Sequence, residues 1–225
     1  MSNEQGLSKE QELHRRWSEW VDVIEAQASL LVEQRHVWNR LKAVIQGNSA
    51  MPGSLIFDFM GLQYATSQSV TVRRVATDTT KGVISLTKLL ESIRANPGVI
   101  TPEMFEVEPL PGLKTDTGFH IFADATGTGL DVSKIDQDLD RLKSGAAQVI
   151  KHYVDDHVAH HSQNPRNALP NFSDLDTAID LIEELTIKYA LLVKQVGIDG
   201  LLPVIDYDWE APLRIPWLSK GGGSE

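Results

Sequence analysis

Along most of the chain, hydrophobic residues recur every three or four positions, which is the spacing of one face of an amphipathic helix. This pattern predicts long helices over residues 8–46, 54–77, 132–161 and 174–196, with a shorter helix over 86–96. No segment shows the alternation of period two that a half-buried strand requires. The pattern therefore predicts an all-α fold.

Polar residues that favour helix starts stand at the predicted boundaries. Ser8 and Gln11 have the spacing of a capping box, and Ser85, Asp131 and Ser173 stand where an N-cap is expected. Each of these side chains can accept a hydrogen bond from a free backbone N–H of the first helical turn.

Glycine and proline mark where helices stop or bend. Pro97-Gly98 ends the short helix, Thr101-Pro102-Glu103 starts another short one, and Gly197 is a plausible stop for the last helix. Gly145 lies inside the predicted 132–161 helix and weakens it, or marks a tight helix crossing.

The hydrophobic stripes predict which residues form the core. Trp17 and Trp38 lie on the stripe of the first helix, and both are predicted to be core residues. The stripe of the second helix is predicted at Leu55, Phe59, Leu62, Ala65, Ser69, Val72 and Ala76.

These elements predict an antiparallel bundle of four to five main helices in one domain, residues 1–197. An irregular insertion is expected at about 109–130. Residues 198–225 hold three aromatic residues, Tyr207, Trp209 and Trp217, and three prolines, at 203, 212 and 216. An extended aromatic tail is therefore expected to lie back over the helices, with its last residues flexible.

Composition and charge exclude several classes of protein. The 225 residues contain no cysteine, which rules out disulfides and thiolate metal ligands. No apolar run reaches the length of a membrane span, so a cytoplasmic protein is expected. The net charge is −10, and residues 131–225 carry 9 basic against 16 acidic side chains. A broad nucleic-acid-binding surface is not expected from this balance.

The stretch from Lys151 to His161 carries four of the seven histidines. On a continuous helix His157, His160 and His161 would share one face, with Asp156 one turn before His160.

The Gly-Thr-Gly of residues 127–129 is no phosphate loop, because no lysine followed by serine or threonine comes after it.

Four interpretations of this stretch remain open. Histidines gather at helix C-termini because the dipole favours cations there. A metal could bind His157 and His161 with a third ligand, His152 or His120. A histidine oriented by Asp156 could act as a general acid and base. Finally, the stretch could bind a partner protein.

Arg73 and Arg74 also have two interpretations. They stand near the C-terminal end of the predicted 54–77 helix, where the helix dipole favours cations. Alternatively, one of them points to a site that binds phosphate.

The chain resembles the HEPN family of all-helical domains, and within it the abortive-infection AbiU type. The resemblance covers most of the chain, and it rests on the order of several loose motifs. These are Arg73-Arg74 with Asp78, Ile84-Ser85-Leu86 with Leu89-Leu90, Tyr153 with Val158-Ala159-His160-His161, Tyr207-Asp208-Trp209, and Pro216-Trp217.

The resemblance implies a helical bundle that forms a homodimer and acts in phage defence or a toxin-type system. Active members of the family are metal-independent RNases without a cofactor. Their motif is an arginine, four to six residues, and a histidine, and two copies meet in a shared cleft. Carried over here, the catalytic histidine is His160.

The arginine of that motif is missing, because residues 153–156 are Tyr-Val-Asp-Asp. Arg141 is too far along the helix to replace it, and Lys151 lies about half a turn away from His160. Arg73, Arg74 or Arg166 could reach the site only through tertiary packing.

Two hypotheses follow. The first is an AbiU-like RNase with His160, Asp156 and His157 as catalytic residues, while Arg73, Arg74 and His161 bind the substrate. The second is a catalytically degenerate HEPN bundle that works as a dimeric binding or regulatory module. The expected partners are a second copy of the chain, RNA, and an antitoxin or regulatory protein.

Overall fold

The structure, a computed structural model, describes residues 7–47, 55–105, 118–160, 162–166 and 169–215. Within these ranges the chain is mostly helical, and the one pairing of extended backbone is an isolated antiparallel bridge between Ala123 and Leu130. The predicted all-α architecture is therefore confirmed.

The elements follow the predicted order closely. The α-helices are α1 (Lys9–Gly47), α2 (Leu55–Val72), α3 (Leu86–Ala95), α4 (Val132–Ser144), α5 (Ala146–Tyr153) and α6 (Phe172–Lys194). Two π-helical segments, η1 (Arg73–Thr77) and η5 (Val154–Val158), continue α2 and α5. The short 3-10 turns are η2 (Pro97–Val99), η3 (Pro102–Phe105), η4 (Phe119–Ile121) and η6 (Ala211–Arg214).

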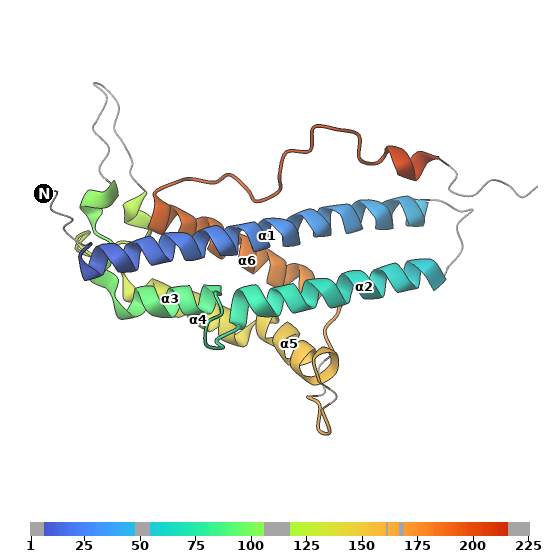
Figure 1. The fold of residues 1–225 in the computed structure, drawn as a ribbon, viewed down its shortest axis with the longest axis horizontal. Coiled ribbons are helices and arrows are strands. Elements are labelled where there is room, and N and C mark those ends of the chain that lie inside the picture. The colour runs from blue at the N-terminus through green and yellow to red at the C-terminus, as the bar shows by residue number, and fades with distance from the viewer. Residues whose placement is uncertain (1–6, 48–54, 106–117, 161, 167–168, 216–225) are drawn as a thin grey trace, which may run out of the picture.

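The helices form a bundle around α1 and α6, which run in opposite directions, while α2 returns beside α1 (Figure 1). The apolar core is one cluster to which α1, α2, α3, α4, α5 and α6 all contribute. Trp17 is completely buried in it, as predicted, and its indole N–H donates to Ser92 Oγ at 2.8 Å. The capping box at Ser8 and Gln11 and the N-caps at Ser85 and Asp131 are also confirmed.

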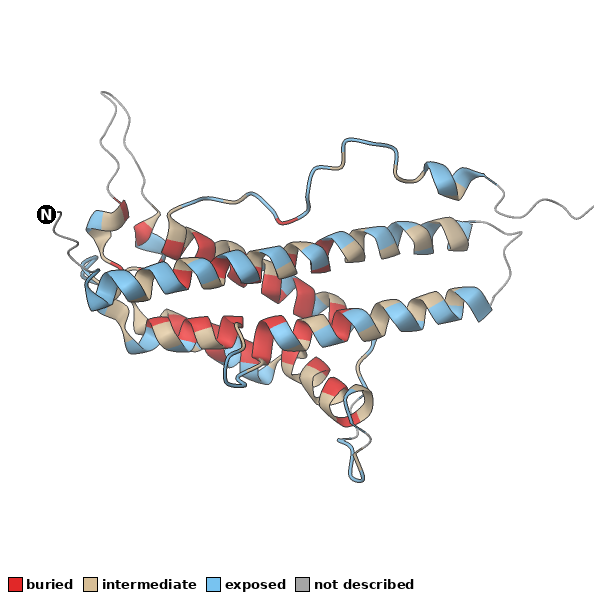
Figure 2. Ribbon diagram, viewed as in Figure 1, coloured by how far each residue is buried: buried red, intermediate tan, exposed pale blue. Residues whose placement is uncertain are grey.

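The far ends of α1 and α2 project beyond this core as a two-helix arm, residues 33–47 and 55–67 (Figures 1 and 2). No described residue of the arm is classed as buried. Trp38, predicted as a core residue, is only half-buried there and stacks on Tyr64 and Phe172 with ring centroids 5.0 and 6.2 Å apart. Gly61 permits this approach, since an added Cβ would lie 3.3 Å from the Trp38 ring.

The predicted stripe of the second helix is wrong in its first half. Leu55, Phe59 and Leu62 are 88%, 60% and 57% exposed. The side chains of α2 that are buried are Gln68, Ser69 and Val72, where the helix has reached the bundle. Periodicity located an apolar face, but the first turns of α2 lie in the arm, away from the bundle core.

The predicted single helix over 132–161 is also wrong. It breaks at Gly145, whose backbone approaches Arg141 O so closely that an added Cβ would lie 2.9 Å from that oxygen. The second part ends at Val158, and Ala159 N–H donates to Val154 O at 2.8 Å in the wider π pattern. His160 therefore lies beyond the helix.

The last helix begins and ends two residues earlier than predicted. Its N-cap is Asn171 rather than Ser173, because Asn171 Oδ1 accepts from Ser173 N and Asp174 N, and Asp174 accepts from Asn171 N in return. Gln195 ends it in the left-handed conformation (φ 55°), before the predicted stop at Gly197.

The described part of the tail, residues 198–215, runs back alongside α1 (Figure 1). Leu201 is buried, Trp209 contacts His36 edge-on at 5.9 Å, and Glu210 accepts two hydrogen bonds from Arg40 at 2.7 and 3.0 Å. Residues 216–225, and residues 106–117 of the predicted insertion, lie outside the described ranges.

Candidate functional site

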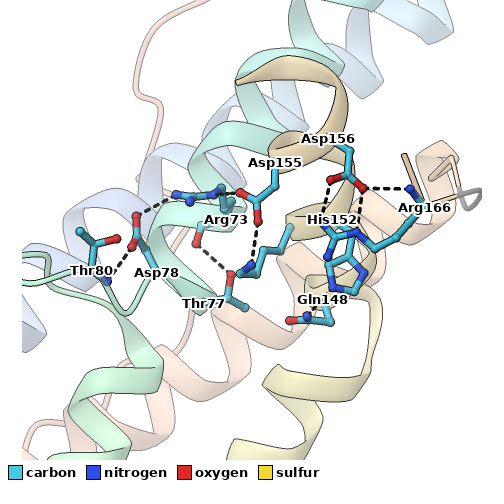
Figure 3. Close-up of polar contacts among 10 residues, drawn as sticks. Arg73, Thr77, Asp78, Thr80, Gln148, His152, Asp155, Asp156 and Arg166 are labelled. Carbon is cyan, nitrogen blue, oxygen red and sulfur yellow. Dashed lines mark hydrogen bonds and ion pairs between the residues drawn. The ribbon is translucent and has the colours of Figure 1, made fainter. Parts of the chain in front are cut away.

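A cluster of charged side chains lies where the two π-helical segments meet (Figure 3). We call the following residues the polar cluster: Arg73, Asp78, Lys151, Asp155, Asp156 and Arg166. Isolated π turns are rare and often occur at functional positions, so the pairing of η1 with η5 makes this region the first candidate for a site.

Arg73 joins η1 to η5. Its Nε donates to Asp155 Oδ1 at 2.6 Å, and its Nη1 donates to Asp78 Oδ2 at 2.8 Å. Lys151, one turn before Asp155, donates to the other oxygen of that carboxylate at 2.7 Å. The carboxylate of Asp155 thus forms ion pairs with two basic side chains. These ion pairs connect the three helical elements α5, η5 and η1.

Asp156 points in another direction and is paired with Arg166. The guanidinium donates to both carboxylate oxygens at 2.6 and 2.7 Å, and the backbone N–H of Arg166 donates at 3.0 Å. Asp156 O also accepts from Ser162 N. These contacts fold the segment after Val158 back onto η5, which is why the helix does not continue to His161.

The aspartates of the cluster are held ionised. The hydrogen bonds from the side chain and the backbone of Arg166 lower the pKa of Asp156 well below its usual range. Partial burial alone would raise the pKa of Asp155, but the hydrogen bonds from Lys151 and Arg73 outweigh it and lower that pKa. Both residues are therefore carboxylates at neutral pH.

The histidines occupy three different surroundings. His152 pairs with Gln148 at 2.7 Å, and burial, with the positive charges of Arg166 and Lys151, lowers its pKa. The ring of His157 lies 5.7 Å from that of Tyr153, and its buried Nε2 has no hydrogen-bond partner within the described chain. His160 is exposed beyond the helix end.

The structure therefore separates several residues that the sequence grouped. Asp156 pairs with Arg166 rather than with a histidine, and His160 is no longer on a helix face with His157. Arg74 turns away from the polar cluster and donates to Gln27 of α1. His161 lies outside the described residues, so its predicted role is not placed.

Apart from Arg74, which donates to Gln27, the substitutes considered for the missing arginine are engaged by acids. Arg141 forms two hydrogen bonds of 2.6 Å with Glu184 of α6. Arg73 and Arg166 do reach the neighbourhood of the histidines through tertiary packing, but each holds an aspartate. The Lys151–Asp155 pair has i, i+4 spacing and could have been found from sequence. Arg73 and Asp155 are 82 positions apart, and no local signal links them.

Two further findings concern metal binding and membrane insertion. No cluster of three or more histidine and acidic side chains that could hold a metal ion occurs among the described residues. In the described part of the chain, no helix is long and apolar enough to cross a membrane.

Comparisons of the chain with known protein families, with curated proteins and with solved structures find no match.

Proposed function

We propose that this protein is a catalytically degenerate, HEPN-like helical bundle that works as a dimeric binding or regulatory module. One observation carries the proposal: each cation that the fold brings to the polar cluster is already neutralised by an aspartate. RNA cleavage without metal needs a cation that is available to the phosphate as negative charge builds up in the transition state.

The strength of these ion pairs supports the proposal. Arg166 meets Asp156 in a bidentate geometry, which is the strongest form of this contact. Because the pKa of Asp155 and of Asp156 is lowered, neither aspartate releases its cation near neutral pH. The carboxylates also repel the phosphate groups of RNA, so a substrate must compete with them for Arg73 and Arg166.

The position of His160 supports it as well. A general base is usually oriented by a second group through a hydrogen bond. His160 is exposed, and within the described residues it has neither a hydrogen bond nor an ion pair. Asp156, the residue expected to orient it, has both carboxylate oxygens on Arg166.

A metal-independent RNase is the second candidate, and one observation favours it. The buried Nε2 of His157 has no hydrogen-bond partner in the described chain, although the residue stands next to Asp156 in sequence. An unpaired buried nitrogen is costly in a purely structural role. His157, rather than His160, is therefore the histidine on which a cleavage mechanism would depend.

The test is cleavage of a structured RNA by the purified protein in EDTA, beside His157→Ala and His160→Ala. The proposal expects no cleavage above background by any of the three proteins. Cleavage by the wild type that His157→Ala or His160→Ala abolishes would overturn it. His120→Ala, a histidine on η4 outside the polar cluster, is the matched control for nonspecific loss.

A further inference from the structure

The first turns of α2 carry a ridge of apolar side chains that faces away from the bundle core. Leu55, Phe59, Leu62, Thr66 and Val70 follow one another at steps of four, three, four and four, so they share one face of the helix. Four of the five are apolar, and all four are exposed. A helix face that meets water is normally polar, so this ridge is typical of a surface covered by another chain.

Two hollows lie beside the ridge. One, of about 450 Å³, is lined on α2 by Phe57, Gly61 and Leu62, and is closed by Trp38 and Phe172. The other, of about 230 Å³, lies between Ser69 of α2 and the start of α6. Ala65 and Phe172 line both hollows, so the two are adjacent. Ridge and hollows together form one surface, which we call the α2 face.

The sizes of the side chains along α2 are arranged for pairing with a second copy in the opposite direction. Large side chains, Leu55 and Phe59, stand in the first turns, and small ones, Ala65 and Thr66, stand later. In an antiparallel pair centred on Leu62, Phe59 of each copy lies over the small residues of the other. A parallel pair would instead set Phe59 against Phe59.

We infer that the α2 face binds the α2 face of a second copy of this chain, antiparallel, with Leu62 at the two-fold axis. Such an interface is self-complementary, because each copy offers both a ridge and a hollow. The inference rests on the proposed function, since it names the partner of that module. It also differs from the histidine-lined cleft that the family resemblance implies, since neither His157 nor His160 lines either hollow.

The distribution of charge makes the α2 face the part of the described surface where a second copy meets little repulsion. The chain has a net charge of −10, so most contacts between copies bring acidic surfaces together. The helix α2 has one charged residue, Asp58, while residues 33–47 of α1 carry three basic side chains and one acidic. A pair of α2 faces therefore brings together surfaces that carry little charge, and Asp58 and Lys42, which line the larger hollow, are of opposite sign.

The first test is the mass of the full-length protein by light scattering across a micromolar concentration series. The wild type is expected to be a dimer. Phe59→Glu places a charge in the interface and is expected to weaken the dimer roughly thirtyfold or more. Since Phe59 is exposed, the variant keeps its fold, which its helical circular dichroism checks. Val204→Glu, at a side chain 95% exposed on the tail, is the matched control and stays dimeric.

The second test uses the absence of cysteine from the chain. A single Leu62→Cys substitution should form a disulfide between copies on oxidation, because residues on a two-fold axis bring their Cα atoms within about 7 Å. Phe59→Cys should not, since antiparallel copies separate these positions by about 9 Å along the axis. Val204→Cys should not either. Cross-linking of Phe59→Cys but not Leu62→Cys would overturn the antiparallel arrangement.

The two proposals fail in different ways. A wild type that dimerises but stays dimeric in Phe59→Glu overturns the α2 interface and leaves the proposed function standing. A wild type that stays monomeric throughout the series overturns both the second-copy inference and the dimeric part of the proposed function, and the RNA assay then decides only whether the bundle is catalytically degenerate. A wild type that dimerises through α2 and also cleaves RNA in EDTA, with loss in His157→Ala, overturns the proposed function while the interface stands.

Discussion

The helices α2 and α6 are both rich in apolar residues, but α6 is buried along most of its length and the first turns of α2 are not. Along α6, eleven side chains are buried, from Leu175 to Val193, because α1, α5 and α2 pack around it. On α2 the buried side chains begin only at Gln68. The first turns of α2 hold exposed and half-buried residues only (Figure 2). Their apolar face meets water, and the nearby rings of Trp38 and Tyr64 are only half-buried.

The contrast teaches what an apolar stripe means. An apolar stripe predicts that a helix face is buried, but it does not show whether the covering surface belongs to the same molecule or to another one. In α6 the covering helices belong to the same molecule. In the first turns of α2 the ridge has no such cover among the described residues, so we assign it to a second copy. Substitutions in the two helices should therefore affect different equilibria: folding for α6, and association for α2.

The largest effect is expected from Leu185→Ala in α6. Leu185 is completely buried, and removing its side chain leaves a cavity in the core. We expect the free energy of unfolding to fall by about 3 kcal/mol, measured by chemical denaturation with an unchanged denaturant slope. A loss of less than about 1 kcal/mol would show that α6 is not the centre of the core.

The core was largely predictable from sequence because it depends on local periodicity and capping. Trp17 and the stripe of α6 were found in this way, as were the caps at Ser85 and Asp131. Trp38 was misplaced for the same reason as Leu55: both lie on a correct stripe in a region that the bundle does not reach. The break at Gly145 depends on a backbone contact that periodicity cannot show.

A smaller effect is expected from Asp155→Asn in the polar cluster. This change removes the charge that holds Arg73 and Lys151, and should cost about 1 to 2 kcal/mol of stability at neutral pH, since both partners are partly exposed. The pKa of Asp155 is lowered, so its contribution is present above its ordinary pKa of about 3.9 and is lost as the pH falls through the lowered value.

The measurement is the difference in unfolding free energy between wild type and Asp155→Asn from pH 7 downward. The difference should stay constant to about pH 5 and shrink below about pH 4. Asp206→Asn, at an exposed position on the tail, should show little difference at any pH. A difference that grows in acid would contradict the ion pair.

The candidate site was predicted less well than the core, and the reason is distance in sequence. Asp155 and Asp156 were recognised as acids near the histidines, but their partners were not. Arg73 reaches Asp155 from 82 positions away, and Arg166 reaches Asp156 only because the helix ends at Val158 and the chain folds back. Tertiary packing decides both contacts, and helical periodicity carries no information about either.

An intermediate test concerns the start of α6. Asn171→Ala removes the side chain that caps the helix and should cost about 1 kcal/mol in thermal or chemical unfolding. Ser173→Ala, at the position that the sequence suggested as the cap, should cost much less because the Ser173 side chain does not cap the helix. If Ser173→Ala cost more than Asn171→Ala, the boundary of α6 in the structure would be wrong.

The smallest effect on folding is expected from Leu62→Ala on α2, and it completes the contrast with Leu185→Ala. The same residue type is removed, but Leu62 is 57% exposed. At dilutions where the protein is monomeric, the unfolding free energy should change by less than about 0.5 kcal/mol. The dimer should instead weaken by about tenfold, since part of a buried leucine is lost from the interface. A Leu62→Ala protein that loses folding stability as Leu185→Ala does would place Leu62 in the core of its own chain, and the apolar face of α2 would then need no second copy to cover it.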